Sequence, residues 1–158
     1  MAATSTNKQP LLVDHVLHTV INLDLATNEG IDVSGANTAV LLVDSTTADG
    51  AVIEDLYLIS RGTVKHEVML FLSNANDYLR PNQGRYIGSV ESAVTVGSLT
   101  SMLLPKTLTP VPHVGDDSFN RALYIPKGSA LWAARKIAPG SSGATTEGPN
   151  VAIQGGWY

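Results

Sequence analysis

The sequence has no cysteine among its 158 residues, which excludes disulfide bonds and thiolate chemistry. It is also poor in charge: charged residues make up 15% of the chain, against about 25% in a typical soluble domain. The net charge is −4, and the lysines and arginines form no basic stripe, so the electrostatic footprint of a nucleic-acid-binding protein is missing. A weakly charged surface is expected where much of it contacts other protein, although a monomer without partners is compatible with the same composition.

Long apolar runs are missing too. The run Ala39 to Val43 is far shorter than the roughly 18 residues that a membrane helix needs. The opening residues Met1 to Pro10 lack the basic start and apolar core of a signal peptide. We therefore expect a protein made in a cytoplasm, with no membrane segment. The length predicts one domain, in which residues 1–10 form a flexible N-terminal arm and residues 11–158 form the folded part.

Turn-forming residues are plentiful and divide the chain into short segments of strand character. The predicted strands, apart from a hairpin described below, are Leu11–Asp24, Ala39–Val43, Val52–Arg61, Thr63–Ser73, Tyr86–Ala93, Val94–Leu104 and Val151–Tyr158. About eight short strands separated by Gly, Pro, Asn and Asp predict an all-β fold, an antiparallel β-sandwich or jelly roll. For Val94–Leu104, a helical stripe is the alternative to a strand.

Two of these segments show which side chains face the core. In Leu11–Asp24, the side chains of Leu17, Ile21 and Leu23 share one face of the strand. In Thr63–Ser73, alternation is clearest in the first half: one face carries Val64, Val68, Leu70 and Leu72, and the other carries Thr63, Lys65, Glu67 and Met69. This alternation predicts one dry and one wet face, as in an antiparallel sheet covered on one side.

The stretch Arg121 to Lys136 predicts a β-hairpin. An apolar run ends at Pro126, which has no N–H for a strand ladder, and Gly128 follows at the last position of a type I turn. A second apolar run, Ala130 to Ala134, is then stopped by the charged pair Arg135 and Lys136. A hairpin this short is stable only within a larger sheet.

The histidines and carboxylates are not arranged as a catalytic or metal site. His15 and His18 are three residues apart on a predicted strand, so they face opposite sides and cannot hold one ion. Glu54 and Asp55 are adjacent and diverge in the same way. The serines occur in no Gly-x-Ser-x-Gly elbow, and the glycine-rich stretch 140–148 lacks the Gly-Lys-Ser/Thr ending of a phosphate loop. We expect no enzymatic activity and no cofactor.

The aromatic residues allow two interpretations. Trp132, Trp157, Tyr158, Tyr78 and Tyr86 are the candidates for a sugar-stacking platform. The alternative, which we favour, is that Trp132 and Trp157 fill a core or a subunit interface, because aromatic side chains dominate burial in both. An exposed indole at either position would favour the glycan-binding interpretation.

Three stretches together resemble a known group of proteins. Asn37 to Asn74 reads Asn-Thr-Ala-Val-Leu-Leu-Val-Asp, a loop, Asp-Gly, a strand, Arg-Gly-Thr, and a strand ending Leu-Phe-Leu-Ser-Asn. Tyr124 to Ala134 reads Tyr-Ile-Pro-Lys-Gly-Ser-Ala-Leu-Trp-Ala-Ala, and the chain ends Val-Ala-Ile-Gln-Gly-Gly-Trp-Tyr. This resembles small β-sandwich virion structural proteins of tailed bacteriophages. The commoner form has an acidic residue after the paired glycines, where this chain has Trp157.

The resemblance implies a capsid decoration (cement) protein on the virion surface, assembled in the host cytoplasm. The implied partners are the major capsid protein and further copies of the chain in a homotrimer, with no nucleic acid and no membrane. A neck or tail adaptor or fibre component of the same virion is the runner-up, and a glycan-binding host-attachment module is the alternative from another class. The candidate interface residues are Leu11, Leu12, Trp132, Trp157 and Tyr158.

Overall fold

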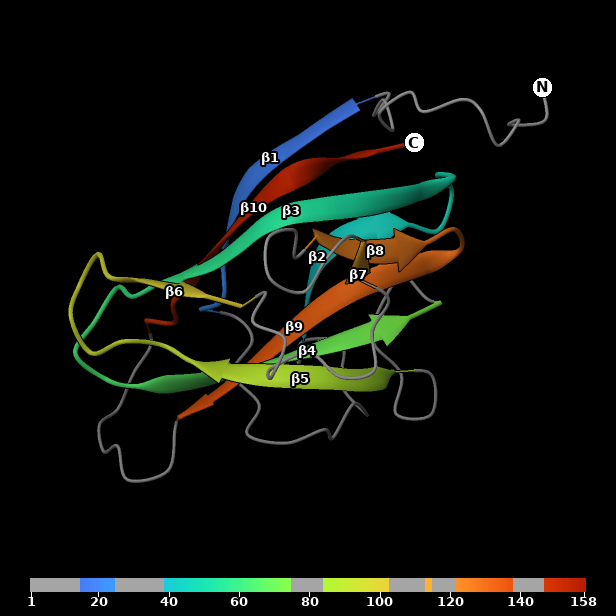
Figure 1. Ribbon diagram of the computed structural model, residues 1–158. Coiled ribbons are helices and arrows are strands. Elements are labelled where there is room, and N and C mark those ends of the chain that lie inside the picture. Colours follow the sequence, from blue (N-terminus) through green and yellow to red (C-terminus); the bar gives the residue numbers. More distant parts are fainter. Residues whose placement is uncertain (1–14, 25–38, 75–83, 103–112, 115–121, 138–146) are drawn as a thin grey trace, which may run out of the picture.

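The computed structural model describes residues 15–24, 39–74, 84–102, 113–114, 122–137 and 147–158, and these form strands and the turns between them (Figure 1). The strands are β1 (His15–Asn22), β2 (Val40–Ser45), β3 (Gly50–Ile59), β4 (His66–Ser73), β5 (Arg85–Glu91), β6 (Leu99–Ser101), β7 (His113–Val114), β8 (Ala122–Pro126), β9 (Ser129–Ile137) and β10 (Asn150–Trp157). Within these ranges, no helix is long and apolar enough to cross a lipid bilayer.

The strands form two antiparallel sheets that pack face to face (Figure 1). Sheet A has the order β1-β10-β3-β8-β7, with β6 paired to the free part of β3, and sheet B has the order β2-β9-β4-β5. The predicted all-β sandwich is therefore confirmed. The strand order does not establish the jelly-roll version of that prediction.

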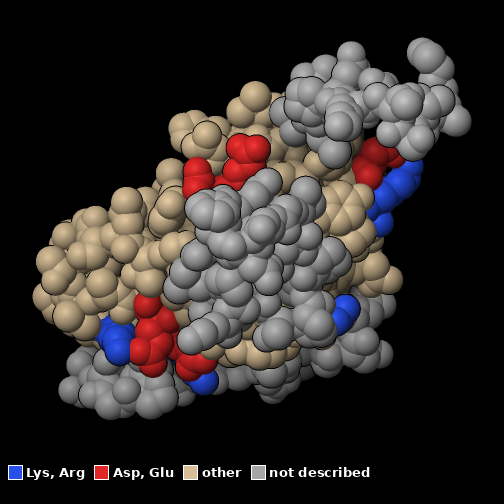
Figure 2. Space-filling view, in the orientation of Figure 1, with Lys and Arg blue, Asp and Glu red and all other residues tan. Residues whose placement is uncertain are grey.

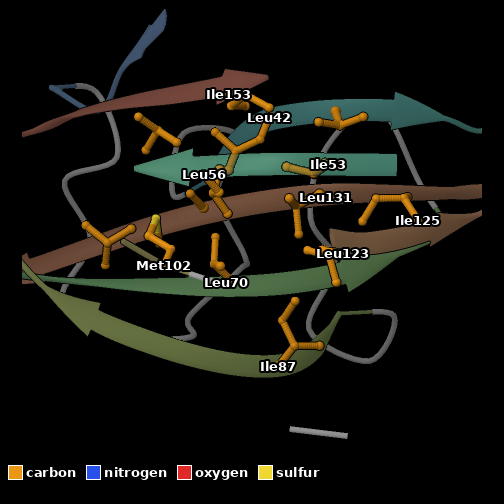
Figure 3. Close-up of a cluster of buried hydrophobic side chains, with 14 of the residues drawn as sticks. Leu42, Ile53, Leu56, Leu70, Ile87, Met102, Leu123, Ile125, Leu131 and Ile153 are labelled. Atoms are coloured by element: carbon orange, nitrogen blue, oxygen red, sulfur yellow. The ribbon is translucent and has the colours of Figure 1, made fainter. Parts of the chain in front are cut away.

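The main core lies between the sheets and is built from their inward-facing aliphatic side chains. Figure 3 shows Ile53, Leu56 and Ile153 of sheet A approaching Leu70 and Leu131 of sheet B. All five are at most 1% exposed. Complete burial of one such side chain contributes about 1.5–3 kcal/mol, so this core is the main source of stability.

The predicted inward face of the first strand is confirmed. Leu17 and Leu23 are buried in the main core and Ile21 packs against it, while Val16 and Val20 are 74% and 56% exposed. The twofold alternation of a strand explains this division.

The predicted wet face of Thr63–Ser73 is wrong over most of β4. Met69 and Phe71 point away from the sandwich interior, yet they are 6% and 2% exposed. They belong to a second buried cluster on the outer side of sheet B, completed by Ala130, Trp132 and Ala134 of β9. Glu67, at the start of the strand, is polar as expected and forms an ion pair of 2.9 Å with Lys136, while Ser73, at the end of the strand, is polar but buried. The outer face of sheet B is therefore dry over much of β4 and β9.

The predicted hairpin is wrong in its pairing, although both strands and the turn exist. β8 pairs with β3 and β7 in sheet A, whereas β9 pairs with β2 and β4 in sheet B. The turn between them therefore crosses from one sheet to the other, and the Gly128 N–H donates to the Ser45 carbonyl at the end of β2 (2.9 Å). The charged pair also does not end the second strand, because β9 continues to Ile137.

The prediction for Val94–Leu104 is confirmed in part, and several other predictions concern residues that the structure does not describe. In the described part of Val94–Leu104, residues 94–102, the strand is Leu99–Ser101, and residues 94–97 form a turn in place of a helical stripe. The flexible arm, Leu11, Leu12, Tyr78 and most of the glycine-rich stretch lie outside the described residues.

Candidate functional site

The connection between β5 and β6 (residues 92–98) and the first residue of β6, Leu99, project apolar side chains from one end of the sandwich. We name residues 92–99 the β5–β6 tip. Val94, Val96 and Leu99 are 53%, 64% and 64% exposed. No charged residue occurs from Ser92 to Met102. Figure 2 shows a broad uncharged surface at the left end of the molecule, where β6 begins in Figure 1. Exposed apolar groups gathered on one uncharged segment are typical of a protein-binding surface.

The β5–β6 tip is held in place by one buried serine. Ser60, just after β3 and 3% exposed, donates its N–H to the Ser98 carbonyl (3.0 Å) and accepts from the Gly97 N–H (2.8 Å). Its hydroxyl donates to the Ala93 carbonyl (2.7 Å). Gly97 has a φ of 81°, a left-handed conformation that favours glycine. The apolar side chains are therefore presented by a preorganised turn.

Trp132, a candidate interface residue, lies in the second buried cluster and is 4% exposed. Its indole packs within the chain beside Met69 and Phe71, so it is not available as a sugar platform. The interpretation of Trp132 as a core residue agrees with the structure.

Trp157 and Tyr158, the other two candidate interface residues that the structure describes, lie at the end of β10 and are half-buried. The Trp157 indole N–H donates to the Asp44 carbonyl (3.1 Å). The Tyr158 N–H donates to the Gly50 carbonyl (3.1 Å), and its ring lies 6.4 Å from that of Tyr124. Burial, with the neighbouring Tyr124 and Glu54, raises the pKa of Tyr158. Trp157 is thus hydrogen-bonded to β2 and Tyr158 to β3. These contacts within the chain explain why both aromatic residues are half-buried.

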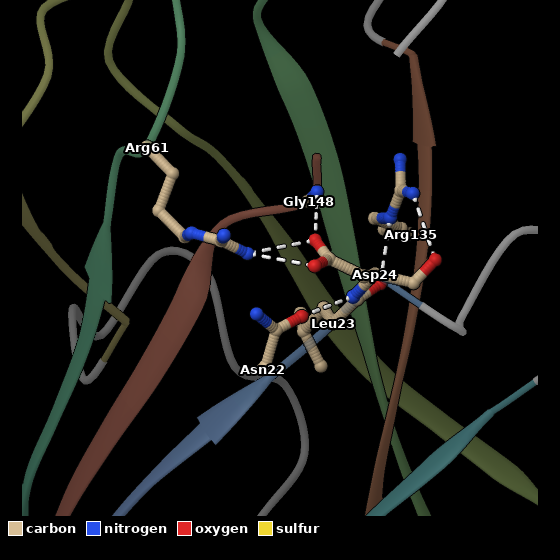
Figure 4. A network of polar contacts seen from close by, with 6 residues as sticks. All are labelled: Asn22, Leu23, Asp24, Arg61, Arg135 and Gly148. Atoms are coloured by element: carbon tan, nitrogen blue, oxygen red, sulfur yellow. Dashed lines mark hydrogen bonds and ion pairs between the residues drawn. The ribbon is translucent and has the colours of Figure 1, made fainter. Parts of the chain in front are cut away.

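A polar cluster connects the two sheets; we name it the inter-sheet clamp (Asp24, Arg61, His66, Arg135 and Gly148; Figure 4 shows all but His66). Both carboxylate oxygens of Asp24, just after β1, accept from Arg61 Nη1 at 2.8 Å. The Gly148 N–H donates to Asp24 Oδ1 at 2.5 Å. Burial acts to raise the pKa of Asp24, but these hydrogen bonds outweigh it and leave the pKa lowered.

Arg135 completes the clamp from sheet B. It is 4% exposed, and its guanidinium donates to the carbonyls of Leu23 (2.7 Å) and Asp24 (3.1 Å). Its Nη1 lies 3.4 Å from Nδ1 of His66, which is itself 3% exposed. Burial and the adjacent positive charge lower the pKa of His66, and a backbone hydrogen bond at Glu147 offsets this only in part. The clamp thus holds the two sheets together.

We expect the clamp to make stability depend on acid in two stages. The pKa of His66 is lowered from 6.5, so its contribution is complete above that value and is lost as pH falls toward the folded pKa, because only the unfolded chain takes up the proton. The pKa of Asp24 is lowered from 3.8, so its contribution is lost further down, as pH falls through its folded pKa. Urea unfolding between pH 8 and 3 measures both stages.

His66→Gln is the control for this prediction. It is expected to flatten the first stage and leave the second unchanged. A wild-type free energy of unfolding that stays constant between pH 7 and 5 would contradict the role given to His66.

No group of three or more potential metal ligands occurs among the described residues. His15 and His18 are both exposed on β1, and Glu54 and Asp55 are adjacent on β3. The exposed apolar surface that the sequence analysis did not single out is the β5–β6 tip. The sequence contains a signal for this surface, the uncharged run Val94-Thr95-Val96-Gly97, in which two valines flank a threonine and a glycine follows directly.

The chain is a β-sandwich with an exposed apolar turn at one end that is held by backbone hydrogen bonds. Comparison with protein-family models, curated proteins and solved structures found no match.

Proposed function

We propose that the protein is a non-enzymatic virion structural protein of a tailed bacteriophage, a capsid decoration (cement) protein that binds and stabilises the shell of major capsid protein. The resemblance of three stretches of the sequence supports the virion class. The β-sandwich, with a core between its sheets and a second cluster on sheet B, suits a particle component whose stability comes from apolar burial without disulfides.

The β5–β6 tip is the observation that carries the proposal. It offers Val94, Val96 and Leu99 to a partner on a turn that is already fixed by Ser60. A preformed turn loses little conformational entropy on binding, so more of the apolar burial appears as affinity. Full burial of an aliphatic side chain is worth up to about 1.5–3 kcal/mol, so burial of these three side chains would supply part of the binding free energy, which also has to offset the cost of immobilising the protein on the shell.

The proposal predicts that the purified protein sediments as a trimer and pellets with assembled capsids of the phage that encodes it. Val96→Asp is expected to weaken capsid binding by at least about tenfold, because a charge would have to be desolvated at the contact. Its melting temperature should stay close to that of the wild type, since Val96 is 64% exposed.

Val16→Asp is the matched control, because Val16 is also an exposed valine (74%) but lies on β1, away from the β5–β6 tip. It should pellet with capsids like the wild type. A wild-type protein that runs as a monomer and remains in the supernatant would overturn the proposal. Imaging of the protein at the neck or tail of the particle would favour the runner-up instead.

A further inference from the structure

The outer face of sheet A carries a row of polar side chains across three neighbouring strands. His18 of β1 is the register partner of Gln154 of β10, and Gln154 is the partner of Asp55 of β3. In the next row, Ala152 of β10 lies beside Tyr57 of β3. Because register partners in adjacent strands point to the same face, these side chains surround one patch of surface.

The patch is hollowed. A depression of about 100 Å³ is lined by His18, Asp55, Tyr57, Ala152, Ile153 and Gln154. The small side chain of Ala152 leaves space beside the ring of Tyr57. His18 and Gln154 are exposed, whereas Asp55 and Tyr57 are half-buried. Within the described residues, no hydrogen bond or ion pair occupies the polar side chains of His18, Asp55 or Gln154, so their donors and acceptors are available to a ligand.

A β-bulge adjoins this depression. The register between β10 and β3 shifts between Gln154 and Gly155, so that Glu54 is an extra residue in β3. The strands approach so closely here that a Cβ on Gly155 would lie 2.0 Å from the Val52 carbonyl oxygen. Bulges recur beside binding sites because they redirect the side chains next to them. This bulge sets the direction of Asp55 and Gln154.

We infer that this depression binds a neutral saccharide. A sugar ring has an apolar C–H face that fits against an aromatic ring such as that of Tyr57. Its hydroxyls both donate and accept, and the site offers a carboxylate acceptor, an amide with donor and acceptor, and an imidazole with both. A mostly apolar floor with a few polar groups at its edge is the usual composition of a small-ligand site.

Other ligand classes fit less well. A phosphate or carboxylate ligand would meet Asp55 and no lysine or arginine among the lining residues. An ammonium group would suit Asp55 and the Tyr57 ring, but the donors of Gln154 and His18 would then have no acceptor on the ligand.

The depression is shallow, so the affinity of a single site is expected to be on the order of 1 mM. If many copies of the protein decorate one capsid, as the proposed function implies, their sites would act together and raise the overall avidity for a glycan surface. Only this step rests on the proposed function.

Titration of the isotopically labelled full chain with glucose, galactose, mannose and N-acetylglucosamine, followed by NMR, tests the inference. At least one sugar should shift amide signals of β1, β3 and β10 around the depression. Gln154→Ala and Tyr57→Leu should each weaken that binding by roughly two- to tenfold. Tyr86→Leu, which changes an exposed tyrosine on sheet B (48%), should leave it unchanged.

The inference is overturned if none of the four sugars shifts these signals, if Gln154→Ala and Tyr57→Leu bind like the wild type, or if methylammonium alone produces the shifts. Gln154 is exposed, so its replacement tests the site without disturbing the core even if Tyr57→Leu is unstable. Capsid binding is measured separately through the β5–β6 tip, so either proposal can fail without the other.

Discussion

Replacing Gly155 by alanine is expected to lower the free energy of unfolding by about 3 kcal/mol. The added Cβ would lie 2.0 Å from the Val52 carbonyl oxygen and 3.0 Å from Ile53 Cα. Both are backbone atoms, so no side chain can rotate away, and β10 has to move from β3 in the middle of sheet A. For a chain of this length the loss corresponds to a fall in melting temperature of roughly 6–12 °C.

Gly62→Ala is the matched control, because a Cβ there has no neighbour closer than 4.0 Å and the backbone needs no positive φ. It should change stability by less than about 0.5 kcal/mol. A Gly155→Ala variant that unfolds at the wild-type urea concentration would show that the two strands do not approach as closely as described.

Replacing Arg135 by methionine is expected to cost about 3 kcal/mol of stability. Methionine keeps an unbranched side chain in the buried position but leaves the carbonyls of Leu23 and Asp24 without the donors that lie 2.7 and 3.1 Å away. The same change removes one of the two causes that lower the pKa of His66. In the folded variant the pKa of His66 should therefore lie closer to 6.5, so the first acid stage should still begin near 6.5 but end at a higher pH and be smaller. Urea unfolding at several pH values measures this change.

Lys127→Met is the comparison for Arg135. Lys127 also forms an ion pair, with Asp49, but both side chains are about 70% exposed (69% and 72%). Solvent screening leaves such pairs with little effect, so the unfolding midpoint should not change. Equal effects of the two substitutions would contradict the buried role of Arg135.

Most strand positions could be predicted from the sequence because each depends on local pattern, but the two-residue strand β7 was not among those predicted. The alternation in Leu11–Asp24 placed Leu17 and Leu23 in the core, and Gly and Pro marked the turns. Strand pairing depends on residues far apart in the chain, so β8 and β9 were expected to pair with each other although each belongs to a different sheet. A tight turn looks the same in sequence whether it closes a hairpin or crosses between sheets.

The side chains of the clamp and of the outer cluster were missed for a related reason. Arg135 and Lys136 look alike in sequence, but they point to opposite faces of β9, so one is 4% exposed and the other pairs with Glu67 near the surface. Met69 and Phe71 point outward from β4, and only their burial in the fold shows that this face is covered. Burial of a given face is a property of the assembled sandwich, which local alternation does not encode.

The position of β10 has a consequence for how the molecule reaches its native state. This strand, residues 150–157, follows every other described strand in sequence, yet it lies between β1 and β3 and supplies the only described ladder that connects β1 to the rest of sheet A. During synthesis, β1 (residues 15–22) therefore has no strand to pair with until β10, more than a hundred residues later, has left the ribosome. Such distant closure makes folding slow, and the nascent chain carries an incomplete sheet until that final insertion.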